Sequence, residues 1–259
     1  FLSLDRTRKV RRWRSGWRNR LSVDAVSSVL PIRNRKVLVG TYGGGLNIIS
    51  LDSATETYSI GNDRVIMLYQ TTSGTIWVGT ESGLFTFNPA SGIAEEIEFA
   101  RSEKNFQTKP IIWDMLESDD GVLWLASMHH GIFVWDPTLN QKKPSLLPTP
   151  ISSSNDIFSS VYSLEIDDFG HIWSSTDSGL VRIDIESKRV QVFSQQHGLQ
   201  LSEFDFGVAH KDNSGFIYFG GSEGYTRFDP ANLKGSQTIP QLRIAKITSP
   251  SAIFQSISH

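Results

Sequence analysis

Five segments of the chain share one strand pattern, and this repeat constrains the fold more than any other feature of the sequence. Each segment is a short apolar run that ends in small residues. The segments are Lys36–Thr41, Thr75–Thr80, Val122–Ser127, His171–Thr176 and Phe216–Gly221. Their aligned central positions are Leu38, Trp77, Trp124, Trp173 and Tyr218. Successive positions are 39, 47, 49 and 45 residues apart. This period is typical of propeller blades built from four strands.

Turn residues recur in step with the apolar runs. Polar clusters that end in glycine precede four of the five segments, at residues 72–74, 119–121, 167–170 and 212–215. Asp and Asn side chains bond to the turn backbone, and Gly takes the positive φ that hairpin turns require. We expect a first strand before each cluster and a third strand after a second glycine turn. A weaker fourth strand is expected next, as at residues 94–99 and 190–193.

These units predict an all-β protein, a β-propeller with five recognisable four-stranded blades over residues 24–239. Residues 1–23 are expected to form a partial N-terminal blade, because residues 1–5 and 9–13 pattern as its third and fourth strands. The chain is therefore predicted to be a fragment of a larger propeller array. Either the N-terminal strands pair with the last blade and close a ring, or the array stays open and its strand edges favour dimers.

Composition excludes several classes of function. The sequence contains no cysteine, which excludes disulfides and cysteine-ligated metals, and its formal net charge of −2 provides no basic excess for nucleic acid. The Arg-rich residues 6–20 include Trp13 and Trp17, but an edge strand protected by charge explains them better, so we expect no nucleic-acid partner. No apolar run reaches the roughly 18 residues of a membrane span, so membrane contact is expected only through segments outside this sequence.

Residues 75–88 and 122–136 come closest to the pattern D-x-x-G-x-hydrophobic-W-hydrophobic-G-T, followed by G-L, an alternating strand and Asp. In this pattern the chain resembles the two-component regulator propeller repeats found in the extracytoplasmic sensor regions of bacterial hybrid histidine kinases and related diguanylate cyclases. Residues 203–230 resemble the last blade of that family, which precedes a small immunoglobulin-like domain. The resemblance assigns residues 240–259 to the first strand of such a domain, here truncated, or to a tail.

The resemblance implies a function in signalling. It implies a ligand-sensing or interaction propeller in the periplasmic or extracytoplasmic part of an inner-membrane receptor, with any histidine kinase or diguanylate cyclase domain elsewhere in the parent protein. The expected partner is an unknown small molecule or glycan, or another protein, and a homodimer of sensor chains fits the family. The alternatives are a protein-docking scaffold without a small-molecule ligand and a polysaccharide-acting propeller enzyme.

The candidate ligand-binding residues lie in the loops that join second to third strands and in those that enter first strands. In a propeller these loops gather on one face around the channel, where binding sites are common on rigid scaffolds. The candidates are Tyr42, Arg64, Glu81, Trp113, His129, His130, Asp177, Glu203 and Glu223. Trp113, on a first strand near the channel, is a candidate to form with Arg64 a platform for a carbohydrate or an aromatic ligand.

We predict no catalytic residue, metal or cofactor for this chain. His129 and His130 are adjacent on a turn, and adjacent histidines rarely ligate one ion without further ligands at a defined spacing. Glu81, Asp177 and Glu223 could face one another as glycosidase carboxylates do, but they occupy equivalent turn positions, which explains their recurrence. Trp77, Trp124 and Trp173 are interpreted as packing between adjacent blades.

Overall fold

The chain folds almost entirely as β-structure. The computed structural model describes residues 2–4, 10–12, 21–50, 55–100, 108–136, 143–146, 160–187, 189–199, 203–233, 247–249 and 252–254. Within these residues the helical elements are two 3-10 turns, η1 (Gln195–His197) and η2 (Pro230–Asn232). The all-β prediction is therefore confirmed.

Strands that follow one another in the sequence pair antiparallel into successive sheets. Sheet 1 consists of β3 (Val26–Ile32), β4 (Lys36–Thr41), β5 (Gly45–Ser50) and β6 (Glu56–Tyr58). Sheet 2 consists of β7 (Val65–Gln70), β8 (Ile76–Thr80), β9 (Gly83–Asn88) and β10 (Ile93–Glu96). Sheet 3 consists of β11 (Ile111–Glu117), β12 (Leu123–Met128), β13 (Gly131–Trp135) and β14 (Ser145–Leu146).

The remaining sheets continue the series. Sheet 4 consists of β15 (Val161–Ile166), β16 (Ile172–Thr176), β17 (Gly179–Ile183) and β18 (Val190–Phe193). Sheet 5 has three strands, β19 (Ala209–Lys211), β20 (Ile217–Gly221) and β21 (Gly224–Phe228), where four were expected. Residues 234–246, which follow η2, lie outside the described residues. Two short hairpins lie near the termini, β1 (Leu2–Leu4) with β2 (Val10–Arg12) and β22 (Ile247–Ser249) with β23 (Ala252–Phe254).

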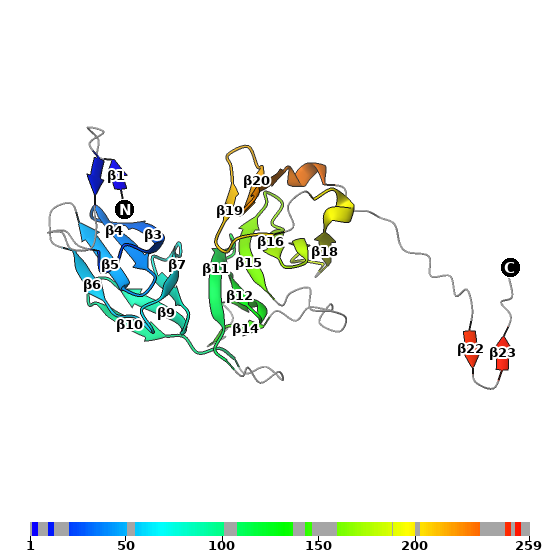
Figure 1. Cartoon of the computed structure of the whole chain (residues 1–259), viewed down its shortest axis with the longest axis horizontal. Helices are drawn as coiled ribbons and strands as arrows, with labels where there is room; N and C mark the ends of the chain where they lie inside the picture. The colour runs from blue at the N-terminus through cyan, green and yellow to red at the C-terminus, as the bar shows by residue number, and fades with distance from the viewer. Residues whose placement is uncertain are drawn as a thin grey trace.

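The five sheets are arranged in series. Their first strands, β3, β7, β11, β15 and β19, contact one another in sequence order. Figure 1 shows the sheets following one another along an arc, from the blue sheet 1 to the orange sheet 5, with β11 near its middle. Because the chain runs back and forth through all strands of one sheet before it moves on, each sheet meets its neighbours through its faces.

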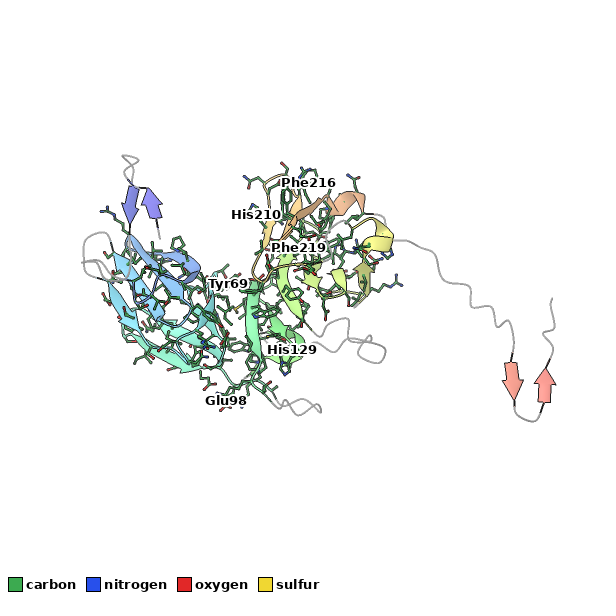
Figure 2. The ribbon with its side chains drawn as sticks, viewed as in Figure 1. Tyr69, Glu98, His129, His210, Phe216 and Phe219 are labelled. Carbon is green, nitrogen blue, oxygen red and sulfur yellow. The ribbon has the colours of Figure 1, made fainter. Side chains whose placement is uncertain are left out.

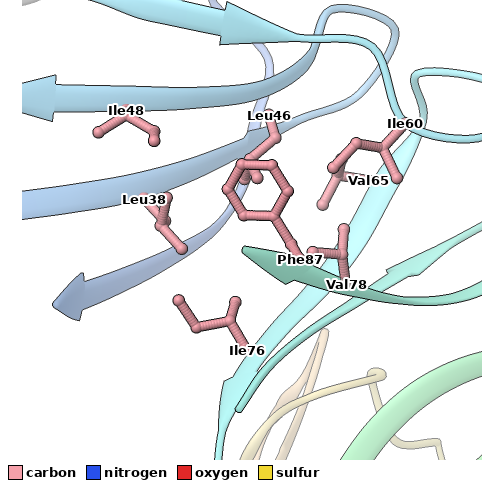
Figure 3. Packing of buried hydrophobic residues seen from close by; sticks show 8 residues of the cluster. All are labelled: Leu38, Leu46, Ile48, Ile60, Val65, Ile76, Val78 and Phe87. Carbon is pink, nitrogen blue, oxygen red and sulfur yellow. The ribbon is translucent and has the colours of Figure 1, made fainter. Parts of the chain in front are cut away.

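The hydrophobic core lies between neighbouring sheets rather than at one centre. Between sheets 1 and 2, Leu38 and Ile48 pack in one buried cluster with Ile76, Val78 and Phe87 (Figure 3). The strand alternation explains this arrangement, since successive side chains point to opposite faces of a sheet and thus to opposite neighbours.

The large rings of the repeat fill the same interfaces, as predicted from the sequence. Trp77 is buried among sheet 3 residues, Trp124 among sheet 4 residues, and the ring of Trp173 lies 4.6 Å from that of Phe228 in sheet 5. Each repeat therefore contributes its second strand to the joint with the next sheet, which is why the motif recurs with the sheet period.

Candidate functional site

One end of every sheet, here called the rim, carries all the candidate residues. The second strand ends and the first strand begins at this end, because the two run antiparallel. His129 lies in a rim turn of sheet 3, whereas Phe216 follows a turn at the opposite end of sheet 5; Figure 2 labels both residues. The rim is where loops from neighbouring sheets approach one another.

At the joint of sheets 1 and 2, three candidate residues form one polar group. Arg64 Nη1 lies 2.8 Å from Glu81 Oε2, and the Tyr42 hydroxyl donates to Glu81 Oε1. The Arg64 guanidinium also lies 5.3 Å from the centre of the Tyr42 ring, and the backbones of Tyr42 and Arg64 form an isolated bridge. The sequence identified all three residues, and the structure brings them together.

This polar group fixes the charge of Glu81. The hydrogen bond from Arg64, supported by that from Tyr42, lowers the pKa of the Glu81 carboxyl, and the same carboxylate raises the pKa of Tyr42. A carboxylate held ionised in this way is a poor proton donor at neutral pH. Glu81 therefore suits binding or structure better than the general acid of a hydrolase.

At the joints of sheets 3, 4 and 5, three aromatic rings form a stack, here called the aromatic shelf. The ring of Trp113 lies 5.2 Å from that of Tyr162 at an interplanar angle of 13°, and 5.5 Å from that of Phe206 at 28°. Phe206 is 51% exposed, which is unusual for a ring of this size. The shelf thus presents apolar surface at the rim.

Two β-bulges place the shelf rings. The ladder shifts register between Ile112 and Asp114 and between Val161 and Ser163, so Trp113 and Tyr162 are the extra residues of β11 and β15. Bulges commonly redirect a side chain near functional sites. Gly207, at φ 68°, donates its N–H to the Tyr162 carbonyl at 3.0 Å and so holds the loop that carries Phe206.

Acidic side chains surround the shelf at Tyr162. Burial raises the pKa of the Tyr162 hydroxyl, and the charges of Asp177 and Glu203 raise it further. Trp113, Asp177 and Glu203 therefore belong to one group, while the expected platform of Trp113 with Arg64 is replaced by the stack with Tyr162 and Phe206. Sequence reasoning missed Tyr162 and Phe206, because the bulge that recurs in the first strands and places Trp113 and Tyr162 leaves no mark in the sequence pattern.

The other candidate residues occupy rim turns. His129 adopts a left-handed φ of 66° in the turn between β12 and β13, and His130 Nδ1 lies 2.9 Å from the Met128 carbonyl oxygen. No group of three or more metal-ligating side chains occurs among the described residues. Glu223 lies in the turn between β20 and β21. Since Glu81 pairs with Arg64 and Asp177 lies near Tyr162, these two carboxylates belong to separate groups.

Comparison of the sequence with known families and proteins gives two matches. A family model described as two component regulator propeller matches residues 59–82, which include β7 and β8. The chain is 25% identical over 214 residues to histidine kinase P4 of Formosa agariphila, an alignment that covers 78% of this chain and 15% of the relative. The chain therefore spans a small part of that protein, and the match supports the resemblance drawn from the repeats.

Solved structures share the fold at low sequence identity. The extracellular domain of a hybrid two component system from B. thetaiotaomicron aligns with a TM-score of 0.68 and 14% identity, over 81% of this chain and 30% of that one. Virginiamycin B lyase from Staphylococcus aureus aligns with a TM-score of 0.56 and 16% identity, over 79% of this chain and 70% of that one. The propeller fold is thereby confirmed. No helix in the described part of the chain could span a membrane.

Proposed function

We propose that this chain, which carries two-component regulator propeller repeats, is part of an extracytoplasmic sensor and binds its ligand at the rim. The aromatic shelf supports the proposal most strongly, because three rings from three consecutive sheets meet there and Phe206 stays exposed. Binding sites typically combine apolar and aromatic surface with a few placed polar groups. Asp177 and Glu203 are such groups, since their charges act on the Tyr162 hydroxyl of the shelf.

A ligand on the shelf would contact several rigid elements at once. Trp113 and Tyr162 are fixed by strands β11 and β15, whereas Phe206 lies on a loop ahead of β19. A ligand shifts an equilibrium only by its difference in affinity between two states, and rings from three sheets provide such a difference when the sheets move. We propose a small molecule or glycan as the ligand and a homodimer of sensor chains as the relay.

The location and the division into domains belong to the same proposal. Relatives of the fold are extracellular domains of two component systems, which supports a periplasmic or extracytoplasmic position for this chain. We assign residues 24–239 to the propeller, 1–23 to a partial preceding blade and 240–259 to a following domain or tail. The chain is proposed to bind rather than catalyse, with any kinase activity in the parent protein.

The shelf can be tested with a thermal-shift panel of oligosaccharides, amino acids and nucleotides. A ligand at 100 times its Kd stabilises the folded chain by ~2.7 kcal/mol. The F206A variant should lose most of the shift, because it removes the exposed ring. The I93A variant is the control, since Ile93 is 58% exposed on β10 at the end of sheet 2 away from the rim. Equal increases in melting temperature for wild type and F206A would place the ligand elsewhere. If no compound of the panel raised the melting temperature, a protein-docking scaffold would be favoured.

A further inference from the structure

At three of the four interfaces between neighbouring sheets, a polar side chain at one position of the first strand accepts a hydrogen bond from the backbone of the next sheet. Ser28 Oγ accepts from the Leu68 N–H at 3.1 Å, and Ser163 Oγ accepts from the Val208 N–H at 2.8 Å. At the joint of sheets 3 and 4 the same role falls to a carboxyl group. Asp114 Oδ2 accepts from the Leu164 N–H at 2.8 Å, and Oδ1 accepts from the Met115 N–H at 2.8 Å.

Only one of these three groups can change its charge in the physiological pH range. Burial raises the pKa of the Asp114 carboxyl to about 7, with a further contribution from Glu165, while the N–H groups of Leu164 and Met115 oppose the shift. The side chain is densely surrounded by protein but keeps a limited opening to solvent, so protons can reach it. Serine hydroxyls at the equivalent positions make the same bond without titrating.

The groups that face Asp114 add little positive charge. Glu165 of β15 raises the pKa of Asp114, and the charges of Asp114 and of Glu117 on β11 both act on Tyr69 of β7. Strands β8, β9 and β12, which also pack on β11, contain no titratable residue. His210 and Lys211 of β19 act on Glu165, whose own pKa is raised mainly by burial. In Figure 2, Tyr69 lies where sheet 2 meets β11.

The Asp114 bond joins the strands that carry two of the three rings of the aromatic shelf. Asp114 follows Trp113 in the β11 bulge, and Leu164 lies two residues after Tyr162 on β15. The two strands that stack the rings are therefore the two strands that the carboxyl connects. Ionisation would place a charge in a poorly solvated joint beside Glu165, and separation of the strands or entry of water would relieve its cost.

We infer that Asp114 is a proton-binding site through which external acidity sets the geometry of the aromatic shelf. The inference rests on the proposed function only in giving the shelf a ligand; the joint itself needs none. Protonated Asp114 keeps β11 and β15 closed and the rings stacked. Loss of the proton to water opens the joint, so the shelf should be more ordered in mildly acidic than in alkaline surroundings.

The sign for stability follows from the raised pKa. The folded chain binds the Asp114 proton more tightly than the unfolded chain does, since the ordinary carboxyl pKa is 3.8. The stabilising contribution is therefore complete below that value and is lost as pH rises through about 7. The melting temperature should fall between pH 5 and pH 8, and this fall should be much smaller in D114S, which installs the residue that β3 and β15 use.

Tryptophan fluorescence tests the shelf itself. Between pH 5 and pH 9, wild-type emission should change with a midpoint near the Asp114 pKa of about 7. W113F should remove this change, and D114S should abolish it while far-UV circular dichroism stays native. D119S is the matched control, because Asp119 is an exposed turn carboxyl of the same sheet. The emission of D119S should change with pH as wild-type emission does. If D114S does not fold, D114N carries the same expectation.

Two results would overturn the inference: a flat wild-type emission profile, or a D114S profile that keeps the wild-type midpoint. The ligand panel is read separately, since the titration is done without ligand. If the emission change depends on Asp114 but the chain binds no member of the panel, the proton site is supported and the ligand site is not. If binding requires Phe206 but no emission change occurs with pH, the ligand site is supported and the proton site is not.

Discussion

Sheets 4 and 5 close their first hairpin with an aspartate, whereas sheets 2 and 3 use a hydroxyl residue at the same place. Asp167 Oδ2 accepts from the Trp173 indole N–H at 2.8 Å, and Asp212 Oδ2 accepts from the Tyr218 hydroxyl at 2.9 Å. In sheet 2 the equivalent Thr71 bonds to the Thr75 backbone. In sheet 4 the aspartate therefore connects the turn to the ring that fills the joint with sheet 5.

The hydroxyl sheets leave their rings without this connection. Ser118 Oγ lies 2.6 Å from Asp120 Oδ1 and 3.0 Å from the Val122 carbonyl oxygen, so its one proton is shared within the turn. Within the described residues, the indole N–H groups of Trp77 and Trp124 are buried and have no hydrogen-bond partner. The comparison teaches that apolar packing alone places the ring, and that the aspartate adds an anchor which two of the repeats do without.

Removal of Asp167, the aspartate anchor of sheet 4, should have the largest effect on stability. The Asp167 side chain is almost fully buried. In D167A the indole N–H of Trp173 and the backbone N–H groups of His171 and Phe169 all lose their acceptor. We expect a loss of ~3 kcal/mol in the free energy of unfolding. Urea denaturation measures it, with D119A as the exposed control. A loss no larger than that of the control would mean that the anchor contributes nothing.

Replacing the rings themselves sharpens the contrast. W173F takes a donor away from Asp167, whereas W77F removes an indole N–H that has no partner in the described structure. Both variants lose similar apolar volume, so W173F should cost about 1 kcal/mol more than W77F. Parallel urea denaturation curves give the difference. Equal costs would show that the hydrogen bond to Asp167 adds no net stability.

The smallest expected effect is a gain. T71D introduces the sheet 4 acceptor into sheet 2, where it can accept from the Thr75 N–H and the Trp77 indole. We expect the free energy of unfolding to rise by about 0.5–1 kcal/mol. The same substitution in a W77F background should give no gain, because the indole donor is absent. A gain that persists in W77F would assign the effect to the turn alone.

Sequence reasoning located the strands and the rim, because both follow from local signals. Glycine turns and apolar runs repeat with the sheets, so residues such as Glu81 and Arg64 were found without knowledge of their contact. Their pairing depends on a backbone bridge between sheets, which no local pattern reports. Of the aromatic shelf only Trp113 was found from the sequence, since a bulge at Trp113 or Tyr162 is a property of strand pairing rather than of composition.

The serial contact of β3, β7, β11, β15 and β19 also governs cooperativity. A protein with one central core unfolds as a single unit, whereas in a linear array each unit is stabilised by its own fold and by the interfaces with its immediate neighbours. A change that stabilises the interface between two sheets therefore affects the unfolding of a distant sheet only through the interfaces that lie between them. The β11–β15 joint divides the array into a part of three sheets and a part of two, whose unfolding it can couple or separate.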